Sequence, residues 1–266
     1  FGVGGVISYK NIKRNRKKYR TTVISIIVCT SVFIALTYFM NLGFREIDKE
    51  MGTQNYNISI NIIKPDKVEK EYKEFLNLDY MERISIERLT NLAISSDYYD
   101  PKLKALLKEN FIDPGSDTQV SVMAIGEDEY DRYLKSLNLN KEDVKDKGIL
   151  INNSFYDVDV DGTSKQVEYD VLKSRKGDSI SGKATNFVNG GYDEKTIEVG
   201  YVTYERPLGL ENQFTGSFLI VSDEYFDKYL KDNMYLSYTI YIHSSNPDKL
   251  QENVENIFSN YDDYGI

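Results

Sequence analysis

The chain has 266 residues, with 33 lysine and arginine side chains against 42 aspartate and glutamate, a formal net charge of −9. Residues 1–44 hold seven basic and no acidic side chains, whereas the remainder holds 26 basic and 42 acidic ones, a net charge of −16. A hydrophobic fraction of 41% with 28% charged residues excludes a wholly disordered chain and a polytopic membrane bundle. The single cysteine and single histidine, Cys29 and His243, exclude an intramolecular disulfide, a multi-cysteine zinc site and a two-histidine metal site.

Residues 1–44 contain a strongly basic segment. All of its basic residues lie between positions 10 and 20: Lys10, Lys13, Arg14, Arg16, Lys17, Lys18 and Arg20. Nucleic acid is a common partner of such a cluster, but the apolar stretch that follows favours contact with anionic lipid, so we expect no nucleic-acid partner. Val3, Val6, Tyr9 and Ile12 recur at intervals of three. Residues 1–20 are therefore predicted to form a basic interfacial helix on the cytoplasmic side.

Residues 21–44 form an apolar stretch of 24 residues without a charged side chain. A helix of this length is about 36 Å long, enough to cross a hydrocarbon core of about 30 Å. A buried core helix rarely runs this far without a charged face. A cleaved signal peptide has a shorter apolar region and a small-x-small cleavage site, which 38–46 lacks. Basic residues near a span stay in the cytoplasm, so we predict a cell-membrane protein with a cytoplasmic N-terminus and residues 45–266 extracytoplasmic.

Beyond the span, short strands alternate with short helices, which predicts a mixed α+β domain over residues 45–266. Strands are expected over 56–63, 84–94, 119–125, 148–152, 166–172, 179–181, 196–204, 217–221 and 235–243. Helices are expected over 65–78, 101–111, 127–137, 223–230 and 247–260, with Ser222 or Asp223 as the cap of the fourth. A division of this domain into two lobes, at about 45–147 and 148–266, stays open.

The sharpest local motif has the spacing of a calcium-binding EF-hand loop. Asp157, Asp159 and Asp161 alternate along the chain, Gly162 follows, and Glu168 comes after five more residues. In an EF-hand these carboxylates converge on one calcium ion, between two flanking helices. Here strands are predicted on both sides of the motif. We therefore favour a β-hairpin in which Asp161 and Gly162 form the turn, and we predict no metal ligand.

No catalytic constellation can be recognised in the sequence. There is no P-loop for a nucleotide phosphate and no Gly-x-Ser-x-Gly motif around a nucleophilic serine. His243 lies in a predicted strand of alternating polarity, where a structural role is expected. We therefore expect no catalytic residue, no cofactor and no enzymatic activity in this chain.

The segment FGVGGVISYKNIKRNRKKYRTTVISIIV at residues 1–28 resembles a recurring segment of the FtsX/MacB-like ABC transporter permeases. In that family a run of the form Ala/Ser-Tyr-Lys-Asn-Ile/Leu-Lys-Arg-Asn-Lys/Arg-x-x-Arg-Thr leads into a membrane helix, and residues 8–21 fit it closely. The later segments GILINN at 148–153, KGDSI at 176–180 and FLIVSDEYF at 218–226 are similar to the extracytoplasmic domain of such permeases.

The resemblance implies a MacB-like periplasmic core fold and a function without chemistry in this chain. A separate ABC ATPase subunit would hydrolyse ATP, and the permease would transmit its motion outward, for export or antimicrobial-peptide resistance. The implied partners are that ATPase, the lipid bilayer, a second permease half or copy, and a peptide or cell-wall ligand. Further spans are expected after Ile266. The alternative is a single-span membrane-anchored sensor, or a binding protein that activates cell-wall hydrolases.

Overall fold

A computed structural model describes residues 2–51, 55–62, 75–109, 118–160, 163–210, 216–234 and 238–258. The chain divides into two compact units, Phe1–Gly52 and Thr53–Ile266. The first is helical and the second combines helices with β-sheet, so the predicted α+β class is confirmed.

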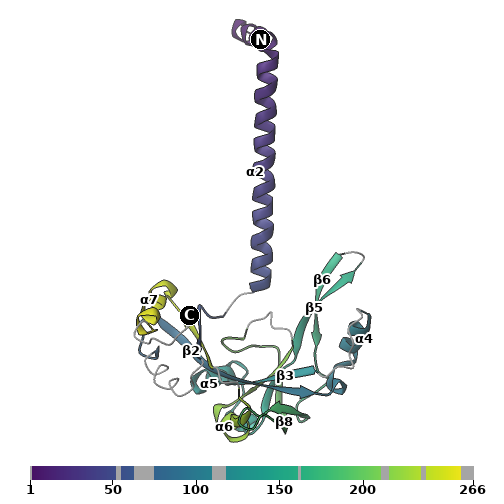
Figure 1. Ribbon diagram of the computed structural model, residues 1–266, viewed down its shortest axis with the longest axis vertical. Coiled ribbons are helices and arrows are strands. Elements are labelled where there is room, and N and C mark those ends of the chain that lie inside the picture. Colours follow the sequence, from purple (N-terminus) through teal and green to yellow (C-terminus); the bar gives the residue numbers. More distant parts are fainter. Residues whose placement is uncertain are drawn as a thin grey trace. The chain divides into compact units, whose positions relative to one another are not determined.

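The N-terminal unit consists of two helices, α1 (Val3–Arg14) and α2 (Arg16–Met51) (Figure 1). Within α2, the 22 residues Arg20–Asn41 have a mean hydropathy of 2.3 and are long and apolar enough to span a membrane. The helix continues beyond the predicted span on both sides without a break. The basic segment is consequently divided between the end of α1 and the first turns of α2.

The second unit contains ten described strands and four described α-helices. The strands are β1 (Ile58–Ile62), β2 (Met81–Ile94), β3 (Thr118–Ile125), β4 (Gly148–Ile151), β5 (Asn153–Val160), β6 (Thr163–Asp170), β7 (Ser179–Thr185), β8 (Tyr192–Thr203), β9 (Ser217–Val221) and β10 (Tyr238–Ser244). The helices are α4 (Pro101–Glu109), α5 (Glu127–Ser136), α6 (Asp223–Tyr229) and α7 (Pro247–Phe258). Short 3₁₀ turns lie at Ser96–Tyr98, Lys141–Val144 and Lys231–Asn233.

Eight of these strands form one sheet, in the order β1-β10-β2-β3-β9-β4-β8-β7. The long strand β2 pairs with β3 along one edge, and at its C-terminal end it pairs with β7 along the other. Six strands therefore close into a ring, β2-β3-β9-β4-β8-β7, in which β3–β9 and β4–β8 are parallel and the other pairs antiparallel. Two adjacent strands of this ring, β2 and β3, come from residues 45–147, and the other four come from residues 148–266, so both halves contribute to one sheet.

Three apolar clusters form the core. The largest gathers one face of the ring strands with residues of α4 and α6, including Leu103 and Phe226. The opposite face of β3, β4 and β9 packs against α5, through residues such as Tyr133 and Leu134. A third cluster joins β1, β10 and β2 to α7. Successive residues of one strand, for example Val122 and Met123, thus belong to different clusters, because successive side chains of a strand point to opposite faces of the sheet.

The elements expected from periodicity are found close to their predicted bounds where the structure describes them. Strand β7 is longer than predicted and runs to Thr185. Ser222 is the N-cap of α6, and its hydroxyl accepts a hydrogen bond from the Tyr225 N–H at 3.1 Å. Most of the helix expected over 65–78 lies outside the described residues.

Candidate membrane segment and surface sites

The predicted membrane-orienting residues lie on the two N-terminal helices. Lys10, Lys13 and Arg14 lie on α1, whereas Arg16, Lys17, Lys18 and Arg20 lie on α2; all have exposed side chains except Lys18, whose side chain lies outside the described part. No acidic residue occurs before position 45, so these charges have no carboxylate near them in sequence. They leave a concentrated positive charge directly N-terminal to the span.

The apolar side chains of α2 are exposed on all sides of the helix. Phe33 and Phe39 have 70% and 73% of their surface exposed, and none of the span is buried against other described residues. The hydroxyls of Thr21 and Thr37 donate hydrogen bonds to backbone carbonyls one turn earlier, those of Lys17 and Phe33, at 3.0 and 2.9 Å. These two hydroxyls are thereby satisfied within the helix, an arrangement that suits a lipid environment.

The EF-hand motif lies in a β-hairpin. β5 and β6 pair antiparallel, so that Asp157 faces Gln166 and Asp159 faces Ser164 across the pair. Asp161 lies outside the described residues, and Glu168 accepts a hydrogen bond from the Asn153 amide at 2.7 Å. Strands rather than helices flank the motif, so the preference for a hairpin over an EF-hand is confirmed. No group of three or more metal-ligating side chains is found in the described ranges.

A buried acidic cluster that the sequence does not reveal connects α5 to β2. The Glu129 side chain is 1% exposed, and its carboxylate accepts a hydrogen bond from the Arg83 Nε at 3.3 Å and one from the Leu208 N–H at 3.1 Å. Glu87, which follows Arg83 by four residues on β2, is also buried. Burial, together with the nearby negative charge of Glu129, raises the pKa of Glu87 well above its usual value.

This acidic cluster holds the loop that follows β8. Gly209 has a φ of +94°, and a Cβ atom there would lie 2.4 Å from the Glu87 Oε1. The Asn55 side chain makes two hydrogen bonds to this loop, donating to the Pro207 carbonyl at 2.7 Å and accepting from the Gly209 N–H at 2.9 Å. The arrangement is a structural anchor, because the two carboxylates contact Arg83, Leu208 and the Gly209 position of the fold itself.

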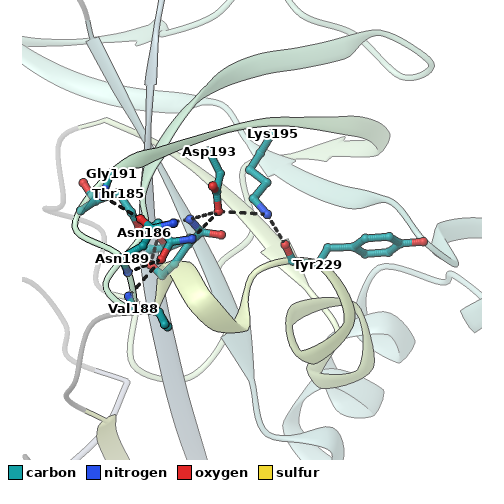
Figure 2. Close-up of polar contacts among 10 residues, drawn as sticks. Thr185, Asn186, Val188, Asn189, Gly191, Asp193, Lys195 and Tyr229 are labelled. Carbon is teal, nitrogen blue, oxygen red and sulfur yellow. Dashed lines mark hydrogen bonds and ion pairs between the residues drawn. The ribbon is translucent and has the colours of Figure 1, made fainter.

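The turn between β7 and β8 is fixed by a second polar network, shown in Figure 2. Asn186 accepts hydrogen bonds from the backbone N–H groups of Val188 and Asn189 at 3.0 and 3.1 Å, and its amide donates to Asp193 at 3.0 Å. The buried Asn233 donates to the same Asp193 carboxylate at 3.0 Å. The hydrogen bonds that Asn233 and Asn186 donate lower the pKa of Asp193, and the one from Asn233 has the larger effect.

His243 lies in β10, with its Nε2 atom 3.7 Å from a Glu82 carboxylate oxygen. Both side chains are about half exposed, so this pair is a surface contact.

No family model matches the chain, and no curated protein matches it either.

Proposed function

We propose that this chain is the opening membrane helix and outer domain of an ABC transporter permease subunit of the FtsX/MacB-like kind. One observation carries the proposal. A 22-residue apolar helix segment begins at Arg20, with six further basic residues on its N-terminal side and an α+β unit on its C-terminal side. Together with the resemblance of residues 1–28, this order of segments favours a permease that opens into an extracytoplasmic domain of the MacB-like periplasmic core type.

The charge distribution supports an orientation with the N-terminus in the cytoplasm. Basic residues beside a span are retained on the cytoplasmic side, and each contributes about 1 kcal/mol of attraction to an anionic leaflet. The exposed Lys13, Arg14 and Lys17 fit this role. The part of the chain after position 44, with its net charge of −16, would then lie outside the cell.

The continuous helix supports a role in transmitting motion. With 36 residues, α2 is about 54 Å long, whereas a hydrocarbon core is about 30 Å thick. The helix therefore leaves the membrane without a break in its hydrogen bonds. A displacement that a cytoplasmic ATPase imposes on its basic end would be carried along the helix axis toward Met51. In this proposal ATP binding and hydrolysis belong to that partner subunit.

Affinity purification of the full-length protein from its own membranes tests the proposal. We expect an ABC ATPase subunit to co-purify in stoichiometric amount, with ATP hydrolysis that is inhibited by vanadate. A single-span protein carrying the same tag is the control for non-specific recovery. Deletion of the gene should in addition lower resistance to antimicrobial peptides if the transporter exports or detoxifies them. Purified full-length protein without an ATPase, from membranes where such subunits are abundant, would contradict the permease proposal.

A single-span sensor or cell-wall-binding protein is the second candidate. One observation favours it: the described residues contain one helix that could span a membrane. Such a protein would keep the same orientation but act without an ATPase. Full-length sequence with no further spans after Ile266 would support this candidate, and three further spans would favour the permease.

A further inference from the structure

The second unit contains a cavity of about 610 Å³, lined by residues at the end of β6, the start of α4 and the end of β8. We propose that this cavity binds the phosphate group of a small phosphate ester, such as a sugar or glycerol phosphate. The site stands apart from the proposed permease function and holds for either candidate function.

Three cations border the cavity within four consecutive residues. Lys173, Arg175 and Lys176 are exposed, and none of them has a carboxylate oxygen within salt-bridge distance in the described part of the chain. Some basic residues of this unit are paired, as Arg88 is with Asp223 at 2.7 Å and Lys147 with Glu198 at 2.7 Å. What distinguishes Lys173, Arg175 and Lys176 is that all three border one cavity, where together they provide positive charge for an anion.

The two acidic residues that line the cavity already accept hydrogen bonds from the protein. The Asp100 carboxylate accepts from the Lys102 N–H at 2.8 Å, at the start of α4. The Asp170 carboxylate accepts from the Tyr204 hydroxyl at 2.6 Å, and this hydrogen bond raises the pKa of Tyr204 to about 12. Both carboxylates are thus directed at donors, and the three cations outnumber them at the cavity.

The beginning of the cationic segment is fixed by backbone contacts. The Lys173 N–H donates to the Tyr98 carbonyl at 2.9 Å. The buried Asn152 side chain holds Leu172 on both sides, donating to its carbonyl at 2.7 Å and accepting from its N–H at 2.8 Å. A ligand would therefore meet the first cation in a position that the fold already determines.

The end of the segment is fixed as well. The Arg175 N–H donates to the Asp178 carboxylate at 2.7 Å, and the Gly177 N–H donates to the Val199 carbonyl of β8 at 2.7 Å. Gly177 has a φ of +91°, a conformation that glycine adopts without strain. Because the backbone is held at both ends, binding needs to order only the side chains of the cations, and the entropic loss on binding is smaller.

The cations are the groups at this cavity that suit a phosphate, because the Asp100 carboxylate already occupies the amino end of α4. Guanidinium and ammonium groups bind phosphate oxygens by charge-assisted hydrogen bonds, for which Arg175 and the two lysines are suited.

The size and wall of the cavity favour an ester over free phosphate. A volume of 610 Å³ lies within the range of small-molecule sites and far exceeds a bare phosphate ion. Tyr201, Val202 and Tyr204 form an amphipathic wall on which a sugar or glycerol moiety can lie. A soluble phosphate monoester and the phosphodiester headgroup of a lipid share this chemistry.

Isothermal titration calorimetry on the detergent-solubilised chain tests the site. We expect glucose 6-phosphate and glycerol 3-phosphate to bind more tightly than inorganic phosphate, and glucose not to bind. Raising sodium chloride from about 50 to about 300 mM should weaken binding, because screening acts on exposed charges. Binding of the monoesters points to a soluble ligand, whereas preferential binding of deacylated phosphatidylglycerol points to a lipid headgroup; both outcomes support the phosphate site. Absence of heat with every phosphate compound at low salt would overturn it.

A charge-matched pair of variants decides whether the three cations are responsible. The triple variant K173Q/R175Q/K176Q should lose at least about tenfold in affinity, because it removes the charges that contact the phosphate. The control R132Q/K135Q/K231Q removes the same charge at exposed positions away from the cavity and should bind as the unaltered chain does. All six positions are exposed, so both variants should fold, which circular dichroism verifies. Equal affinity of the two variants would refute the proposal.

Discussion

The Glu129 carboxylate, almost fully buried on α5, accepts hydrogen bonds from both the Nε and the Nη2 of Arg83 on β2. The guanidinium is partly exposed, so the ion pair connects the interior of the second unit to its surface. A carboxylate with 1% of its side chain exposed needs these donors, because transfer of an unpaired charge from water is strongly unfavourable.

Replacement of Arg83 by glutamine should therefore destabilise the second unit. The variant keeps part of the packing but leaves the charge of Glu129 without its counterion, and we expect a loss of about 2 kcal/mol in the free energy of unfolding. Urea unfolding followed by circular dichroism measures it. R132Q, at an exposed position of α5, is the control and should change stability little. Equal midpoints for the two variants would show that the ion pair contributes nothing.

The buried Glu87 predicts a particular pH dependence of stability. Its pKa is raised in the folded state, first by burial and then by Glu129, so the folded chain binds a proton more tightly than the unfolded chain does. The contribution of Glu87 to the free energy of unfolding is complete below the usual pKa of a glutamate, about 4.3. This contribution is lost as the pH rises through the raised pKa of the folded state.

E87Q should consequently remove this loss. Its stability relative to the unaltered chain should increase as the pH rises from about 4.3 upward, because an uncharged amide has no proton to release. Unfolding free energies measured at a series of pH values test this. If the difference in unfolding free energy between E87Q and the unaltered chain is constant over that pH range, Glu87 does not titrate as inferred.

Gly209 should be intolerant of a side chain. A Cβ atom there would lie 2.4 Å from both the Glu87 Oε1 and the Tyr241 ring, and the φ of +94° adds strain. We expect G209A to lower the unfolding free energy by about 2–3 kcal/mol. Gly190 has a φ of +72° but nothing within 4 Å of its Cβ position, so G190A serves as the control for strain alone. We expect it to lose about 1 kcal/mol.

Asn233 should stabilise the turn between β7 and β8. Its side-chain amide donates to Asp193 and to the Thr185 carbonyl, while its backbone carbonyl accepts from the Thr90 hydroxyl at 2.6 Å. N233A should lower stability by about 2 kcal/mol, since it removes both hydrogen bonds of the side-chain amide, one of them to a carboxylate. It should also bring the pKa of Asp193 closer to its ordinary value, which carboxyl NMR can follow. N189A, in the exposed part of the turn, should have a smaller effect on both quantities; the reverse order would contradict the role given to Asn233.

Most elements of the second unit can be predicted from periodicity because their patterns are local. In β3, for example, Val120 and Val122 alternate with the polar Gln119 and Ser121, and the chain continues into the charged helix α5. The closure of the ring cannot be predicted in this way. It depends on the pairing of Leu92–Ile94 with Gly182–Ala184, which lie far apart in sequence, and on the close approach of the Ala93 carbonyl to Gly182.

The burial of Glu129 and the cavity beside Lys173 are harder to predict from the sequence. The three acids in the first turn of α5 look alike in sequence, and all three fit a favourable interaction with the helix dipole. Only Glu129 is buried, and the available signal is its spacing of four residues from Tyr133, which places it on the apolar face. The basic run of Lys173, Arg175 and Lys176 is visible in sequence, but its cavity depends on α4 and β8.

Cysteine labelling in intact cells tests the proposed orientation across the membrane most directly. Cys29 is replaced by serine, and a single cysteine is placed at Ser8 or at Ser179, both exposed in the structure. A membrane-impermeant maleimide should label the cysteine at position 179 in intact cells and the one at position 8 only after lysis. Labelling of position 8 in intact cells, with position 179 protected until lysis, would contradict a cytoplasmic N-terminus and an extracytoplasmic α+β unit.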